Sequence, residues 1–119
     1  MGQHLQPASS PAVAPGRLRV VNAGSDPRLD GGQLIPLASE VVLGAEADRL
    51  GPHDLLVQDL YVSGRHARLS WDGVRWWVED LGSTNGTFVD EQRIAPQDRV
   101  LLPVGGTLRV GDATFELLE

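Results

Sequence analysis

The chain has 119 residues, a formal net charge of −6 and no cysteine. This length suits one domain, the missing thiols exclude disulfide frameworks and thiolate metal sites, and the negative charge argues against a nucleic-acid binder, which needs cations to neutralise phosphates. All ten cations are arginine, so lysine-dependent Schiff-base and phosphate-loop chemistry is also excluded.

The N-terminal segment, residues 1–16, is rich in small residues and is interrupted by Pro7, Pro11 and Pro15. It shows no apolar period, so it offers too little apolar surface to offset the entropy lost on ordering. We expect residues 1–16 to be a disordered tail or a linker, and residues 17–119 to form one domain.

From Arg17 onward, short runs of Val, Leu, Ile, Trp and Phe alternate with Gly, Asp, Asn and Pro. Segment Ala45–Leu50 is compatible with one helical turn, which Gly51-Pro52 would end. Many short strands with turn signals between them predict an all-β sandwich or barrel. The predicted strands are Leu18–Asn22, Gln33–Leu37, Val41–Leu43, Leu55–Gln58, His66–Trp71, Arg75–Asp80, Thr87–Val89, Arg99–Leu102, Thr107–Val110 and Thr114–Leu118.

Two of these strands alternate between apolar and polar residues, which predicts one buried face for each. The dipeptide Asp72-Gly73 between them favours a two-residue hairpin turn, and Gly111-Asp112 could close a second hairpin. Trp77 points away from the apolar face, so it is either partly buried under a loop or part of a protein-contact patch. The apolar face itself comprises Ala67, Leu69, Trp71, Val74, Trp76 and Val78.

Catalytic and metal sites find little support in the residue pattern. No two histidines have metal-ligand spacing, and the Gly-x-Ser-x-Gly motif of serine hydrolases is absent. Ser63 and His66 alone leave a hydrolase hypothesis open. We expect no catalytic residues, no metal and no cofactor. Short aliphatic runs and the lack of a signal peptide predict no membrane insertion and a cytoplasmic protein.

Two polar loop segments carry the most informative residues, Ser63-Gly64-Arg65 and Gly82-Ser83-Thr84-Asn85-Gly86. Their hydroxyls, amide and backbone groups either fold each loop onto itself or point at a polar ligand. If the fold brings both loops to one edge, the uncharged donors and one arginine suit a phosphate monoester, which carries about −1.5 to −2 charges at neutral pH.

At these residues the sequence resembles the forkhead-associated (FHA) domains, from about Arg17 to Leu118. The resemblance rests on four ordered elements: Leu43-Gly44, Ser63-x-x-His66-Ala67, the stretch from Asp80 to Val89, and Val110-Gly111-Asp112. It implies a β-sandwich of about eleven mostly antiparallel strands that reads phosphothreonine in short peptides with loops at one end. The overall sequence pattern looks most like that of bacterial members that work alongside Ser/Thr kinases.

Matched by motif position, the resemblance implies that Ser63 binds the phosphate and that Thr84 reaches the phosphothreonine. Asn85 would bind the neighbouring peptide backbone, and Gly64 would offer only its backbone N–H. His66 would brace the loops without touching the ligand. The expected phosphopeptide-binding set is Ser63, Gly64, Arg65, Ser83, Thr84, Asn85 and Arg49, with Gly44, His66, Gly82 and Gly86 as structural support.

The sequence departs from the family at Ala45, where an arginine that contacts phosphate usually follows the glycine. Losing one charge-assisted hydrogen bond of about 1.5–3 kcal/mol weakens binding roughly 10- to 150-fold. Arg49, four positions further on in a lengthened loop, could restore the charge, and Arg65 is the other candidate. A smaller departure is Asp90-Glu91, where the family usually has Asn-Gly. The acidic neighbours that could repel phosphate are Asp59, Asp80, Asp90 and Glu91.

The sequence therefore predicts a phosphothreonine-peptide recognition module that assembles Ser/Thr-kinase signalling complexes. Its expected partners are phosphothreonine-containing proteins, either a Ser/Thr kinase or its substrates. Ala45 and the acidic balance motivate an alternative, a degenerate FHA sandwich that contacts partners or a second copy independently of phosphate, through Trp77 or an exposed sheet.

Overall fold

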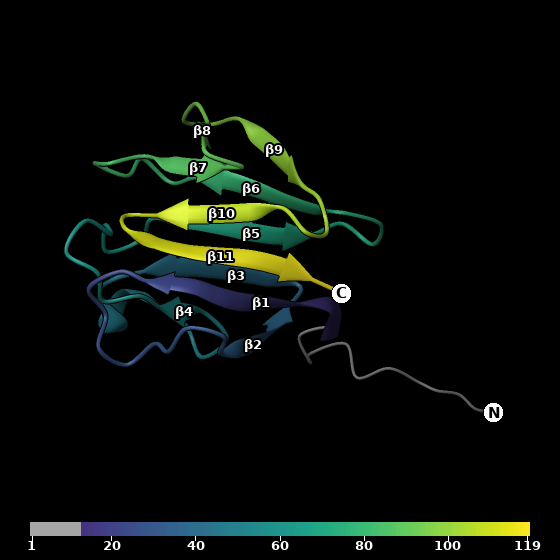
Figure 1. Cartoon of the computed structure of the whole chain (residues 1–119). Coiled ribbons are helices and arrows are strands. Elements are labelled where there is room, and N and C mark those ends of the chain that lie inside the picture. Colours follow the sequence, from purple (N-terminus) through teal and green to yellow (C-terminus); the bar gives the residue numbers. More distant parts are fainter. Residues whose placement is uncertain (1–12) are drawn as a thin grey trace.

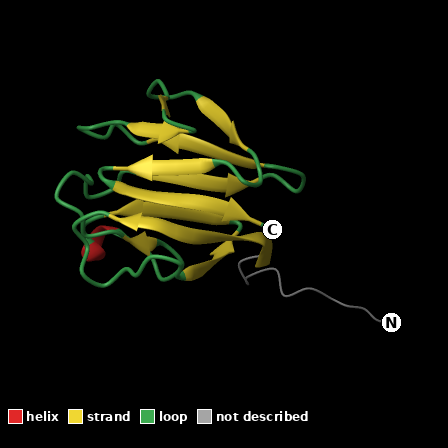
Figure 2. Ribbon diagram, in the orientation of Figure 1, coloured by secondary structure: helices red, strands yellow, loops and turns green. Residues whose placement is uncertain are grey.

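The computed structural model describes residues 13–119, which form eleven strands in two sheets packed face to face (Figures 1 and 2). The first sheet contains β1 (Val13–Ala23), β2 (Leu34–Ala38), β7 (Thr87–Val89), β8 (Gln92–Arg93), β10 (Thr107–Val110) and β11 (Ala113–Leu118). The second contains β3 (Glu40–Gly44), β4 (Leu55–Leu56), β5 (Ala67–Trp71), β6 (Trp76–Asp80) and β9 (Arg99–Leu102). A single 3₁₀ turn, η1 (Ala47–Arg49), lies between β3 and β4. No helix among residues 13–119 is long and apolar enough to cross a membrane.

The strand order is β2-β1-β11-β10-β7-β8 in the first sheet and β4-β3-β5-β6-β9 in the second. All strand pairs are antiparallel except β3 and β4, which run parallel with Leu43 opposite Leu55. This arrangement confirms the predicted eleven-stranded, mostly antiparallel sandwich.

The core lies between the two sheets and is built by alternate residues of each strand. Leu18 and Phe115 enter it from the first sheet, and Leu43 and Leu69 enter it from the second, all fully buried. Trp76 is only 2% exposed, which confirms its predicted place in the core. Val74 was expected on the same face but is 71% exposed, because it lies in the β5–β6 turn.

The β5–β6 hairpin turns one residue later than predicted. The backbone N–H of Asp72 donates to the carbonyl of Arg75 at 3.1 Å, so Gly73 and Val74 form its tip. Gly73 has φ +100°, a conformation that favours glycine. Hydrogen bonds from the Arg75 backbone and the Trp77 indole lower the pKa of Asp72 to about 2. The second predicted turn, Gly111-Asp112, is confirmed, since Val110 pairs with Ala113.

Strand β1 begins at Val13, inside the segment that composition assigned to a tail. Ala14 is 5% exposed, and the indole Nε1 of Trp76 lies 2.9 Å from the position that a Cβ of Gly16 would take. Pro15 is tolerated because the register between β1 and β2 shifts between Val13 and Arg17. The predicted tail is therefore corrected for residues 13–16, while residues 1–12 lie outside the described part of the chain.

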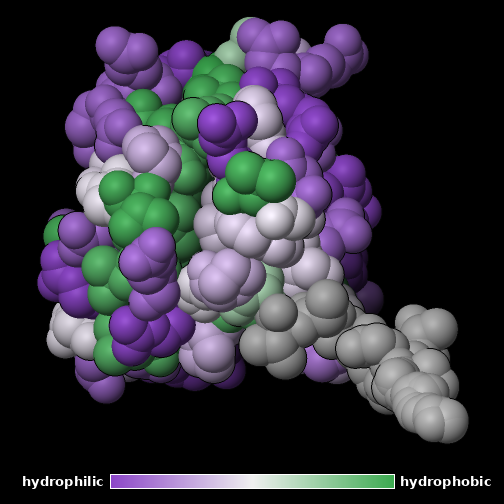
Figure 3. Space-filling view, turned by 90° about the vertical axis from the view of Figure 1, so that its right-hand side faces the viewer, coloured by the Kyte–Doolittle hydropathy of each residue, from purple (hydrophilic) through white to green (hydrophobic). Residues whose placement is uncertain are grey.

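Apolar side chains gather at the end of the sandwich where β1 starts and β11 ends (Figure 3). Val74 and Val104 are exposed there, 71% and 57% respectively. A pocket of about 240 Å³ lies among them, lined by residues that include Pro15, Trp71, Trp76, Leu101 and Pro103. The loops that carry the predicted site lie at the opposite end.

Candidate functional site

The two predicted polar loops meet at the end of the sandwich that is on the left in Figure 1. The backbone N–H of Thr84 donates to the hydroxyl oxygen of Ser63 at 3.1 Å, and the Asn85 side-chain amide donates to the carbonyl of Tyr61 at 3.0 Å. Thr84 and Asn85 are exposed, and Ser63 is half-buried. The fold thus brings Ser63, Thr84 and Asn85 together on one accessible edge.

His66 lies beneath these loops and is fully buried. Its Nδ1 accepts the backbone N–H of Ser63 at 3.1 Å, and its Nε2 donates to the carbonyl of Gly86 at 2.8 Å. This pattern requires the neutral Nε2–H tautomer, and burial lowers the pKa of His66. One imidazole therefore holds both loops in register.

The same geometry removes the hydrolase hypothesis. A serine nucleophile needs its hydroxyl hydrogen-bonded to the base. Here the ring faces the backbone N–H of Ser63, and its second nitrogen is occupied by Gly86. No group of three or more potential metal-ligating side chains occurs within the described residues either.

Asp80 organises the loop between β6 and β7. Its carboxylate accepts the backbone N–H groups of Gly82 and Ser83, both at 3.1 Å, and the hydroxyls of Ser83 and Thr87. The Ser83 hydroxyl also accepts from the Gly86 N–H at 3.0 Å, so this predicted ligand group is engaged inside the loop. Burial raises the pKa of Asp80, but these donors outweigh it and the pKa is lowered overall.

Asp59 is a second buried carboxylate, which sequence reasoning treated only as a repulsive neighbour. It is 3% exposed and accepts N–H groups from Ser25, Tyr61 and Asp112 at 2.7–3.1 Å. Burial raises its pKa, and the donors again outweigh burial to lower it. Asp59 therefore joins three loops at the binding end. The only local signal was an Asp two residues before a loop N–H, which is typical of many turns.

Gly44 is needed for the close approach of β3 to the segment around Gly64. A Cβ at Gly44 would overlap the carbonyl oxygen of Gly64. Directly beside it, the N–H of Ala45 donates to the carbonyl of Ser63 at 3.0 Å. In the other loop, Gly82 and Gly86 have φ +82° and +90°, so both predicted supporting glycines adopt the left-handed conformation.

The two candidate arginines lie in different places. Turn η1 brings Arg49 back over Gly64, with its Nη1 2.9 Å from the position that a Cβ of Gly64 would take. Arg49 also forms an exposed ion pair with Glu46 at 3.2 Å. Arg65 instead lines a separate shallow depression with Arg68 and residues 51–54. The structure therefore places Arg49 beside the Ser63 loop, whereas Arg65 lines this separate depression.

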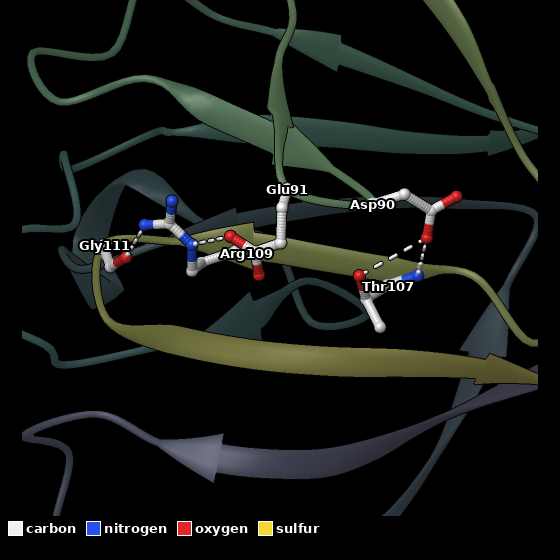
Figure 4. Close-up of polar contacts among 5 residues, drawn as sticks. All are labelled: Asp90, Glu91, Thr107, Arg109 and Gly111. Atoms are coloured by element: carbon white, nitrogen blue, oxygen red, sulfur yellow. Dashed lines mark hydrogen bonds and ion pairs between the residues drawn. The ribbon is translucent and has the colours of Figure 1, made fainter.

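Trp77 and the acidic turn lie apart from this cluster. The Trp77 indole N–H donates to Asp72 at 2.8 Å, and the Arg99 guanidinium stacks 4.8 Å from the ring centroid, so Trp77 is half-buried. Asp90 and Glu91 form the β7–β8 turn and contact β10 (Figure 4). Neither acidic residue approaches Ser63 through these contacts.

Comparison with known proteins agrees with this geometry. The sequence model of the FHA domain family matches residues 41–111, more than half of the chain. The FHA domain-containing protein FhaB of Mycobacterium tuberculosis is 44% identical over 86 residues, which cover 72% of this chain and 52% of FhaB. The chain thus spans about half the length of the curated relatives it matches.

Two solved structures have the same fold. The FHA domain of the CT664 protein from Chlamydia trachomatis superposes with a TM-score of 0.71 at 23% identity, covering 87% of this chain and 96% of that one. EmbR of Mycobacterium tuberculosis, solved with a low affinity phosphopeptide, superposes with a TM-score of 0.70 at 27% identity, covering 90% of this chain and 24% of EmbR. Because the family model matches more than half of the chain, the chain belongs to the FHA domain family, whose members are recognition modules that bind phosphothreonine peptides.

Proposed function

We propose that this domain reads phosphothreonine peptides with Ser63, Gly64, Thr84, Asn85 and Arg49. The observation that carries the proposal is the junction of the two loops, held from below by the buried His66. These hydrogen bonds already join the two loops, so ligand binding would have to order few additional groups.

The hydrogen-bond donors and acceptors left unused at this junction match a phosphorylated threonine. Ser63 Oγ already accepts from the Thr84 N–H, which leaves its own proton free to donate to a phosphate oxygen. Asn85 uses one amide proton on Tyr61, which leaves a donor and an acceptor for the peptide backbone. Arg49 supplies the positive charge that Ala45 cannot.

The partner class follows from the ligand. A protein that carries a phosphothreonine in a flexible segment would present the required dianion, and a Ser/Thr kinase or its substrate is the proposed source. EmbR, a structural relative, was solved with a phosphopeptide, which supports a phosphopeptide ligand here. The domain would then assemble Ser/Thr-kinase signalling complexes inside the cell.

Amide chemical-shift titration with a phosphothreonine peptide and its unphosphorylated twin tests the proposal. We expect saturable shifts at Ser63, Gly64, Thr84 and Asn85 with the phosphorylated peptide alone. Ser63→Ala should weaken binding roughly 10- to 150-fold, because it removes a hydrogen bond to a charged group worth about 1.5–3 kcal/mol. Asn85→Ala should weaken it as well.

A matched control is Ser70→Ala. Like Ser63, Ser70 is half-buried, but it lies within β5 and not in the binding loops. This variant should bind like the original chain. Equal shifts with both peptides, or unchanged affinity in Ser63→Ala and Asn85→Ala, would reject the assigned site.

A further inference from the structure

The lengthened loop after β3 places an acid as well as a base over Gly64. The backbone N–H of Glu46 donates to the Gly64 carbonyl at 3.4 Å, and the N–H of Arg49 donates to the Glu46 carbonyl at 3.0 Å. The Glu46 carboxyl carbon lies 2.8 Å from the position that a Cβ of Gly64 would take, and Arg49 Nη1 lies 2.9 Å from it. Both charged groups therefore occupy the space that the missing side chain of Gly64 leaves open.

This space adjoins the groups that the proposed function assigns to the phosphate. Glu46 and Arg49 pair at 3.2 Å, and their side chains are 54% and 57% exposed, so the pair can open without unpacking the core. A carboxylate and a phosphate both bind a guanidinium through oxygen acceptors. A phosphate that reaches Arg49 would therefore meet a carboxylate already paired with it.

We propose that Glu46 is a built-in competitor of the phosphate for Arg49, and that it sets the threshold of negative charge a ligand needs. This inference rests on the proposed function. Glu46 is tethered three residues from Arg49, so its effective concentration there is high. A single carboxylate from an acidic peptide gains little by replacing it. A phosphate of about −1.5 to −2 charges attracts Arg49 more strongly and displaces it.

The test is calorimetric titration of the phosphothreonine peptide, and of a peptide with aspartate in its place, into four variants. They are Glu46→Gln, Arg49→Gln, the double variant, and Asp48→Asn as the matched control. Asp48 is an exposed acid in the same turn, and it is absent from the ion pair on Arg49. Asp48→Asn therefore changes the net charge as Glu46→Gln does while leaving the pair intact.

Glu46→Gln should tighten phosphopeptide binding about two- to fivefold, the range expected for releasing one exposed ion pair. It should also make binding of the aspartate peptide measurable. Asp48→Asn should give a smaller gain on both peptides. In the Arg49→Gln background, Glu46→Gln should lose most of its effect.

Three results would overturn the inference while leaving phosphothreonine recognition by Ser63, Thr84 and Asn85 in place. Equal gains from Glu46→Gln and Asp48→Asn would indicate general repulsion. Weaker binding by Glu46→Gln would make Glu46 a support for Arg49. Unchanged affinity in Arg49→Gln would show that Arg49 does not bind the phosphate, and would also remove Arg49 from the proposed site. If the original chain does not distinguish the phosphorylated peptide from its unphosphorylated twin in the chemical-shift titration, the proposed function fails and the inference fails with it.

Discussion

At the scale of single residues, His66 couples the binding loops to the protonation state of one buried ring. Its Nδ1 must accept a hydrogen bond from the backbone N–H of Ser63. A proton on Nδ1 would place two donors, the Nδ1–H and the Ser63 N–H, face to face. Burial keeps the folded-state pKa of His66 below its ordinary value of 6.5. The unfolded chain therefore takes up a proton below about pH 6.5 that the folded chain resists.

We predict that the titration of His66 does not change the free energy of unfolding above about pH 6.5. It should fall as the pH drops below that value, by at most about 1.4 kcal/mol per pH unit. Urea unfolding between pH 5 and 7.5 measures this slope. His66→Gln should be less stable and should lose the slope, whereas His53→Gln, which removes an exposed imidazole, should retain it.

The buried carboxylates do not contribute to the pH dependence of the unfolding free energy between pH 5 and 6.5. The pKa values of Asp59 and Asp80 are lowered from an ordinary value of 3.8, so their contribution to stability is lost only as the pH falls through and below that value. A slope between pH 5 and 6.5 that persists in His66→Gln would contradict the assignment to His66.

Residue roles were predictable from sequence only where a motif carries them. Ser63, Thr84 and Asn85 stand in such a motif, and the fold brings them together. Ser83 stands in the same motif, yet its hydroxyl is engaged by Asp80 and Gly86. The hub role of Asp59 depends on loops that converge from distant parts of the chain, including Ser25 and Asp112, and no local pattern shows that convergence.

At the scale of elements, the β7–β8 turn is built from residues that fit it poorly. Asp90 and Glu91 have φ +49° and +66°, a left-handed conformation that costs an L-residue about 1–2 kcal/mol relative to the right-handed one. Contacts to β10 offset part of this cost (Figure 4). The Asp90 carboxylate accepts the Thr107 N–H at 2.8 Å, and Glu91 pairs with Arg109 at 3.1 Å.

We predict that Glu91→Gly raises the free energy of unfolding by up to about 1 kcal/mol. Glycine adopts positive φ without strain, and the lost ion pair is exposed on the glutamate side and worth about 0–1 kcal/mol. Thermal and urea unfolding measure the change. Glu91→Gln separates the two contributions, because it removes the charge and keeps the strained backbone, so it should be neutral or slightly destabilising. A destabilised Glu91→Gly would show that the contact with Arg109 outweighs the strain.

Strands with an alternating apolar pattern were predictable, and β5 and β6 are the clearest cases. Strand β8 was missed because it is two exposed polar residues, Gln92 and Arg93, whose pairing depends on the preceding turn. The pattern in Leu55–Gln58 was apolar enough to predict a strand, but only Leu55–Leu56 pair, in parallel with the end of β3. Pairing direction of this kind depends on the path of the connecting loop.

At the scale of the whole molecule, the two ends of the sandwich differ in chemistry. The end with the binding loops presents hydroxyls, amides and the Glu46–Arg49 pair, whereas the opposite end presents Val74, Leu101 and Val104 around the apolar pocket (Figure 3). The start of β1 lies at this apolar end, where Pro15 lines the pocket and Gly16 covers Trp76. Composition could not predict this role, because proline and small residues are typical of linkers as well as of irregular edge segments.

The first four residues of β1 should therefore contribute to stability. We predict that a chain beginning at Arg17 is less stable than one beginning at Val13 by about 1–3 kcal/mol. The shorter chain loses the burial of Ala14 and the backbone that covers the Trp76 indole. Urea unfolding measures the difference, and a red shift of tryptophan emission in the shorter chain would report the exposed indole.

Because this end lies opposite the binding loops, phosphopeptide affinity should be equal in the two chains under conditions where both are folded. Equal stability would instead mean that residues 13–16 pack without strengthening the fold.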